Sequence, residues 1–248
     1  LLQKFIQRKF SLGNQVDVSL TVSEEGKGSI YVNDIPLTEN HITTPYYEDL
    51  PIQVKAVPKS GYRFLRWEEM TETKLDTLTQ IVKPGLSLTA VFEKGDSLVI
   101  NEIHYNPSVT QGESDAEFIE LYHAGKTAID ASGYSFTQGI RFIFPEGTII
   151  QPGDYVIIAR NTKFYRTLKS ITLAWDEGKL ANEGEEIRLT DRFGHILNSV
   201  HYGVSAPWPQ SPNGRGYTLS LANPASDNSD PRNWLSSTAK GGSPGRLN

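Results

Sequence analysis

The stretch LVINEIHYNPSVTQGESDAEFIELYHAG, residues 98–125, decides the fold of this chain. It holds two apolar runs, 98–105 and 117–123, that are rich in β-branched and aromatic residues, and a polar loop of turn-forming residues separates them. Alternation along the second run places Glu120 on the same face as the aromatic residues two positions before and after it. A carboxylate between aromatic side chains is unusual on a strand that faces solvent. The stretch therefore predicts two β-strands and draws attention to Glu120.

Composition narrows the class of protein. Of 248 residues, 38% are hydrophobic and 21% charged, which is typical of a folded chain with a sizeable core. No apolar run approaches the ~20 residues that a membrane-spanning helix needs. The net charge of −5 argues against a nucleic-acid partner held through its phosphates. The absence of cysteine excludes disulfides and thiolate metal sites.

The first 15 residues predict one short amphipathic helix. Its apolar residues recur at steps of three and four, and they are Leu1, Leu2, Phe5, Ile6 and Phe10. Gly13 and Asn14 are expected to end it. So short an apolar stripe is not stable alone, and we interpret residues 1–15 as the last helix of a domain that precedes this part of a longer protein.

Residues 16–94 predict a small all-β domain. Short alternating runs are separated by glycine and proline, among them GKGSIYVN, VKAVPKSGYRFLRW and LSLTAVF. These runs resemble the divergent internalin-type B-repeat, a β module of bacterial surface proteins. The residues that match its pattern are Gly61, Tyr62, Phe64, Trp67, Ala90 and Phe92. We expect the aromatic ones to pack in the core rather than to form a binding platform.

Residues 95–248, after the charged joint 93–97, predict a second all-β domain. The ordered series LANEGEEIRLTD, SVHYG, WP, GYTLSL, NW and SPG runs from residue 180 to residue 245. This series and the opening strands resemble the lamin tail domain across residues 98–248, which implies an immunoglobulin-like β-sandwich. The order of helix, B-repeat-like domain and lamin tail domain is in turn similar to the C-terminal part of spore-coat-H-like kinase proteins, which implies a kinase-like domain upstream.

Glu102 and Glu120 are the candidate metal site, because the two predicted strands would bring them opposite each other. Paired carboxylates can act as general acid and base or hold a hard cation such as calcium through their oxygens. Alternatively, each accepts hydrogen bonds from loop amides and fixes the loop 106–115. We expect the hydrogen-bonding role, because no third ligand or nucleophile is placed by the sequence.

The run SDNSDPRNW, residues 226–234, echoes the start of a calcium-binding loop. Counted from Asp227, however, position six is Arg232 instead of glycine, and position twelve is Thr238 instead of glutamate. We expect Asp227 and Asp230 to be turn and cap residues, with a surface calcium as the alternative.

Three aromatic residues, Trp208, Tyr217 and Trp234, lie in the proline-rich last third of the chain and are candidate binding residues. Exposed aromatic rings suit contact with a protein or a carbohydrate. The alternative is that the two tryptophans cover one end of the sandwich, as the lamin tail resemblance implies.

These observations predict no catalysis and no cofactor beyond calcium as an option. No G-x-S-x-G occurs, the histidines lack metal-ligand spacing, and no nucleophile, base and orienting group come together. We predict a non-catalytic binding or spacer module of a bacterial exported or cell-surface protein, which contacts a protein or a carbohydrate. The alternative function is a substrate-docking domain that serves a kinase-like or hydrolase domain upstream.

Overall fold

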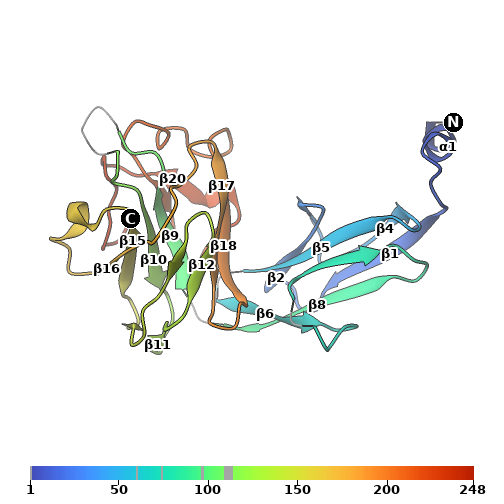
Figure 1. Cartoon of the computed structure of the whole chain (residues 1–248), viewed down its shortest axis with the longest axis horizontal. Helices are drawn as coiled ribbons and strands as arrows, with labels where there is room; N and C mark the ends of the chain where they lie inside the picture. Colours follow the sequence, from blue (N-terminus) through green and yellow to red (C-terminus); the bar gives the residue numbers. More distant parts are fainter. Residues whose placement is uncertain (1, 60, 74, 96–97, 109–113) are drawn as a thin grey trace. The chain divides into compact units, whose positions relative to one another are not determined.

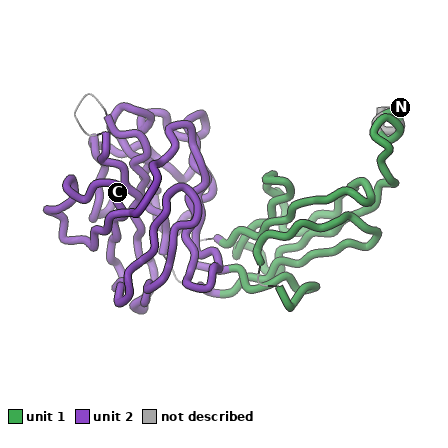
Figure 2. Tube along the Cα trace, viewed as in Figure 1, with its two compact units in different colours: residues 1–58, 64–93 green, residues 59–63, 94–248 purple. Residues whose placement is uncertain are grey.

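The computed structural model describes every residue except 1, 60, 74, 96–97 and 109–113. The described chain is almost entirely β-structure with one short α-helix, as predicted (Figure 1). It divides into two compact units (Figure 2). The first comprises residues 1–58 and 64–93, and the second comprises residues 59–63 and 94–248. The short segment 59–63 thus groups with the second unit, although the sequence placed it inside the first domain.

The first unit is built from two four-stranded sheets. The strand orders are β4-β1-β8-β6 and β3-β2-β5-β7; β1 pairs with β4 antiparallel and with β8 parallel, and the pairs of the second sheet are antiparallel. The elements are α1 (Leu2–Lys9), β1 (Gln15–Val22), β2 (Gly28–Val32), β3 (Ile35–Pro36), β4 (His41–Tyr47), β5 (Pro51–Pro58), β6 (Tyr62–Trp67), β7 (Thr77–Ile81) and β8 (Ser87–Lys94).

Alternation along the strands builds the core of this unit. In β1 and β8 every second side chain is buried, so each strand gives one face to the core and one to solvent. Phe64, Trp67 and Phe92 meet there, which confirms the packing role expected for these three aromatic residues, whereas Tyr62 is half-buried and does not belong to this core. Gly28 is required because a Cβ atom at that position would overlap the ring of Phe92.

The N-terminal helix is present but shorter than predicted. It ends at Lys9, and Ser11 adopts a left-handed conformation with φ of 51°. The chain therefore leaves the helix before Gly13 and Asn14, the residues expected to end it. Phe5 and Phe10 are 60% and 63% exposed, so part of the apolar stripe faces solvent.

The second unit is a β-sandwich. A six-stranded sheet, β16-β15-β10-β9-β19-β20, faces a four-stranded sheet, β13-β12-β17-β18, and β11 pairs with β14. The strands are β9 (Leu98–His104), β10 (Phe118–His123), β11 (Ile129–Asp130), β12 (Ser135–Gln138), β13 (Phe142–Ile143), β14 (Ile149–Ile150), β15 (Tyr155–Ala159), β16 (Ile171–Ala174), β17 (Gly184–Thr190), β18 (Ile196–Gly203), β19 (Leu219–Leu221) and β20 (Trp234–Ser236); the 3₁₀-helices are η2 (Thr162–Tyr165) and η3 (Pro231–Asn233).

The central strands of the larger sheet are covered on both faces. One large apolar cluster takes side chains from both sheets, including Ile100, Ile103 and Leu121. A smaller cluster around Phe118 and Tyr165 lies on the other face of the same strands. As a result, all seven residues of β9 are buried. Polar side chains on the second face must therefore find partners within the protein.

Candidate functional site

Glu102 and Glu120 lie directly opposite each other on neighbouring strands. The antiparallel register of β9 and β10 pairs the two residues, and neither side chain has any exposed surface. Just beyond this pair a β-bulge inserts Asn101 into β9, so that Ile100 pairs with Leu121. The bulge breaks the alternation, and Ile100 joins the main core while Glu102 faces the opposite side. Strict alternation along β9 predicts that these two residues share one face, and this prediction is wrong because of the bulge.

Glu102 is bound by a ring of hydroxyl and amide donors. Its Oε1 accepts hydrogen bonds from Thr218 Oγ1 at 2.5 Å, Ser220 Oγ at 3.2 Å and the backbone N–H of Ser243 at 3.0 Å. Gly242 approaches so closely that a Cβ atom there would overlap Oε1, and its φ of +71° is a conformation that glycine adopts readily. The closing segment of the chain is thus fitted onto this carboxyl group.

Glu120 is held by two donors. Asn101 Nδ2 donates to its Oε1 at 2.8 Å, and the backbone N–H of Gly245 donates to its Oε2 at 2.6 Å. The sequence predicted that these carboxyl groups fix the loop 106–115. Residues 109–113 of that loop lie outside the described residues, and the donors found come instead from the bulge and the C-terminal segment. The two glutamates therefore anchor residues 242–245, which we call the C-terminal strap.

Burial controls the protonation of the pair. Loss of hydration and, second to it, the nearby charge of Glu102 raise the pKa of Glu120, and the hydrogen bonds from Gly245 and Asn101 oppose both effects; the net result is a pKa of about 8. Burial also raises the pKa of Glu102, against the donors Thr218, Ser243 and Ser220. At neutral pH the Glu120 carboxyl group is accordingly protonated. A neutral acid beside a second carboxyl group has the chemistry of an acid–base pair, but it has no surface that a substrate could reach.

The donor set fits hydrogen bonding better than metal binding. Calcium takes six to eight oxygen ligands, whereas this site supplies two carboxyl groups whose oxygens already accept protein hydrogen bonds. Within the described ranges, no group of three or more His, Cys, Asp or Glu side chains is placed to hold a metal ion. A calcium role for Glu102 and Glu120 stays a prediction.

The loop 226–234 uses its carboxylates within its own turns. Asp227 Oδ1 accepts from the N–H and Oγ of Ser229 at 3.0 and 2.6 Å. Asp230 caps η3 by accepting from the N–H of Arg232, and it also forms an ion pair with the Arg232 guanidinium. The turn and cap roles are therefore confirmed.

The three candidate aromatic residues are not equivalent. Trp234 is 2% exposed within the core, and its Nε1 donates to the Asn228 carbonyl at 2.9 Å, so the binding role assigned to it is corrected to packing. The Trp208 ring packs on it at 5.9 Å between ring centroids and is half-buried. Tyr217 is also half-buried. A binding role for Trp208 and Tyr217 stays a prediction.

Sequence reasoning did not find the partners of the glutamates, which are Asn101, Thr218, Ser220, Ser243 and Gly245. One signal was present: the T-L-S pattern of residues 218–220 puts two hydroxyl groups on one face of a strand. The SPG motif was noted as part of the domain pattern, but no local rule connects it to residues more than 120 positions earlier.

The fold defines two all-β modules, and in the second of them buried carboxyl groups accept hydrogen bonds from the chain's own donors. Family models identify both modules: residues 18–96 match the Divergent InlB B-repeat domain, and residues 93–204 match the Lamin Tail Domain. The chain thus carries a divergent InlB B-repeat domain followed by a lamin tail domain, as predicted. Both are non-catalytic domain types that are typical of surface proteins.

The other comparisons add little. The crystal structure of a DUF4876 family protein from Bacteroides thetaiotaomicron is similar over 84% of this chain and 86% of that chain, with 12% sequence identity. Its TM-score of 0.38 is too low to support an argument about fold or function. No curated protein matches the chain. Among the described residues, no helix is both long and apolar enough to cross a membrane.

Proposed function

We propose that this chain is a non-catalytic interaction module of a bacterial exported or cell-surface protein, and that it binds a protein or a carbohydrate. The observation that carries the proposal is the complete burial of Glu102 and Glu120 beneath the C-terminal strap. Both domain types found in the chain support it, since neither is catalytic and both are typical of surface proteins.

The geometry argues against chemistry at the carboxyl pair. A general acid must reach the atom that it protonates, directly or through one water, at about 2.6–3.2 Å. Here that position is filled by the backbone of residues 243–245 and by the hydroxyl groups of Thr218 and Ser220. Each donor forms a hydrogen bond with a carboxyl oxygen that would otherwise be buried without a partner. These hydrogen bonds stabilise the fold, and this structural role is sufficient to explain the arrangement.

The test combines binding with turnover. The purified chain is applied to arrays of glycans and of bacterial surface proteins, and it is also incubated with glycoside and phosphoester substrates. We expect binding to at least one glycan or protein and no turnover. Turnover that survives purification and disappears in Glu120→Gln would overturn the non-catalytic assignment, and a complete lack of binding on both arrays would overturn the interaction module.

A further inference from the structure

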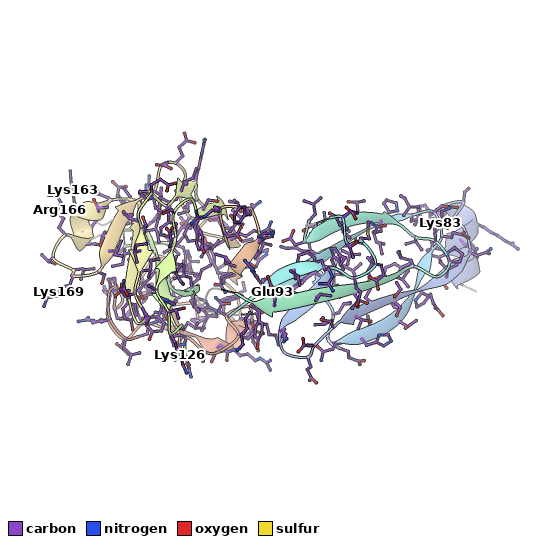
Figure 3. The ribbon with its side chains drawn as sticks, turned by 90° about the horizontal axis from the view of Figure 1, so that it is seen from below. Lys83, Glu93, Lys126, Lys163, Arg166 and Lys169 are labelled. Carbon is purple, nitrogen blue, oxygen red and sulfur yellow. The ribbon has the colours of Figure 1, made fainter. Side chains whose placement is uncertain are left out.

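The excursion that connects β15 to β16 carries an unusual concentration of positive charge. Lys163, Arg166 and Lys169 follow one another at three-residue intervals, and all three side chains are exposed. In Figure 3 they lie at one end of the second unit and point away from its sheets, while Lys126 lies apart from them. Within the described part of the chain, none of the three forms an ion pair.

This lack of partners contrasts with five arginines of the same unit, each of which forms an ion pair with a nearby carboxylate. The nearest N–O distances are 2.6 Å for Arg160 with Glu117, 3.4 Å for Arg141 with Glu177, 3.0 Å for Arg188 with Glu186, 3.3 Å for Arg192 with Asp130 and 2.6 Å for Arg232 with Asp230. Like charges three residues apart repel each other modestly. The whole chain has a net charge of −5, so the excursion is a positively charged region of a negatively charged protein. An anionic partner would reduce the repulsion among its three cations.

The backbone that carries these cations is held in place. Asn161 caps η2 by accepting from the N–H of Lys163 at 3.1 Å. Tyr165 is 5% exposed, donates its hydroxyl to the Ala116 carbonyl at 2.7 Å and packs its ring against Phe118 at 5.3 Å. A fixed backbone lowers the ordering cost that a partner has to meet when it binds.

An exposed aromatic ring lies among the cations. Phe164 follows Lys163 directly and is 42% exposed. Beside it is a half-open cavity of about 270 Å³, lined also by Leu168 and Pro244. An aromatic face offers a surface on which the apolar face of a sugar ring can pack, while flanking cations bind anionic substituents of that sugar.

We propose that the cationic surface formed by Lys163, Phe164, Arg166 and Lys169 binds an acidic polysaccharide. The cations pair with its carboxylate or phosphate groups, and Phe164 contacts a sugar ring. This assignment rests on the proposed interaction function and specifies its ligand class. It places the contact on the β15–β16 excursion, separate from Trp208 and Tyr217.

The experiment measures binding of the whole chain to polygalacturonate, to a phosphate-bearing mannan and to neutral dextran, each at two salt concentrations. Polyglutamate and single-stranded DNA serve as anionic polymers that are not polysaccharides. The test variant is Lys163→Ser/Arg166→Ser/Lys169→Ser. The matched control, Lys126→Ser/Arg215→Ser/Lys240→Ser, removes the same three charges from exposed positions elsewhere in the second unit. Melting curves verify that both variants fold.

We expect the test variant to bind an acidic polysaccharide roughly tenfold more weakly, the control to stay within about twofold, and dextran not to bind. Binding should weaken as salt rises. The carboxylate and phosphate polymers separate the two anionic sources. Phe164→Ser should weaken binding at unchanged charge, which a simple ion exchanger would not show.

Three results would overturn the assignment. The first is an equal loss of polysaccharide affinity in the test and control triple variants. The second is binding of polyglutamate or single-stranded DNA as tight as that of the acidic polysaccharides, with no effect of Phe164→Ser, and the third is no binding of an acidic polysaccharide at all. If the last result occurs while the arrays detect a neutral glycan or a protein, only this assignment fails and the interaction function stands. If the arrays also detect nothing, both fail.

Discussion

The two units differ in the kinds of side chain that their β-sheets bury. In the first unit, strands such as β1 and β8 alternate between buried and exposed positions, and the core is apolar. Every buried polar or charged side chain in the described chain belongs to the second unit. The difference arises because the central strands there are covered on both faces. On a second covered face, polar side chains depend on partners within the protein, and for Glu102 and Glu120 the C-terminal strap supplies part of them.

The comparison predicts that the units are stable separately. The proposed boundary lies at the joint 93–97, of which residues 96–97 lie outside the described residues. Limited proteolysis should release a resistant piece that begins near residue 95. Since residues 59–63 group with the second unit, a fragment of residues 95–248 that melts far below the intact chain would contradict this boundary.

The strap should be the most sensitive part of the second unit. Gly241→Ala and Gly242→Ala place a Cβ atom at similar positive φ values, +77° and +71°, but only the second overlaps Glu102 and Thr218. We expect about 1–2 kcal/mol of destabilisation for Gly241→Ala from the backbone alone. Gly242→Ala should cost about 3 kcal/mol more by denaturant unfolding. Equal losses would show that the strap does not pack as tightly as described.

Removing one carboxyl group should have a smaller effect. Glu120→Ala leaves the Asn101 amide and the Gly245 N–H without their acceptor, at a cost of about 1–3 kcal/mol, so the melting temperature should fall by several degrees. The fall should be the same with calcium and with a chelator. If Glu120 is instead a metal ligand, a chelator would destabilise the wild type and have no further effect on Glu120→Ala.

The matched carboxylate of the first unit should matter least. Glu69 accepts hydrogen bonds from the N–H and Oγ1 of Thr89 at 2.7 and 2.8 Å, but it is exposed. Water can replace both bonds, so Glu69→Ala should cost less than about 1 kcal/mol in a chemical denaturation experiment. A cost equal to that of Glu120→Ala would remove the distinction between the two units.

The local features were predictable from the sequence, and the distant ones were not. Alternation correctly placed Phe118 and Glu120 on one face of β10, away from the main core. The alternation rule failed at Asn101, because the β-bulge there adds one residue to β9 and cannot be recognised from the hydrophobic pattern of the sequence. It also could not show that Gly245 covers Glu120, since local periodicity carries no information about segments that meet from opposite ends of a domain.

The cationic surface was missed for a different reason. Its three basic residues at regular spacing, with Phe164 among them, were visible in the sequence. Their significance depends on the absence of an ion pair within the described residues and on the anchoring of Tyr165, and both are properties of the folded chain.

The central claim is that Glu120 is a buried, protonated acid that anchors the strap. A carboxyl group has an ordinary pKa of 4.5, and that of Glu120 in the folded chain is about 8. Between these values the folded state holds a proton that the unfolded state has released. The stabilising contribution is therefore complete below pH 4.5, and it is lost as the pH rises through about 8.

The most direct test is the melting temperature of wild type and Glu120→Gln at pH 5 and pH 9, because the variant carries the neutral group permanently and shares every other titrating residue. At pH 5 we expect the variant to melt a few degrees below the wild type, because its one carboxamide oxygen can accept from only one of the two donors, Asn101 Nδ2 and the Gly245 N–H. At pH 9 the wild type should melt at least about 5 °C below the variant. A variant that is less stable by the same margin at both pH values would contradict the claim.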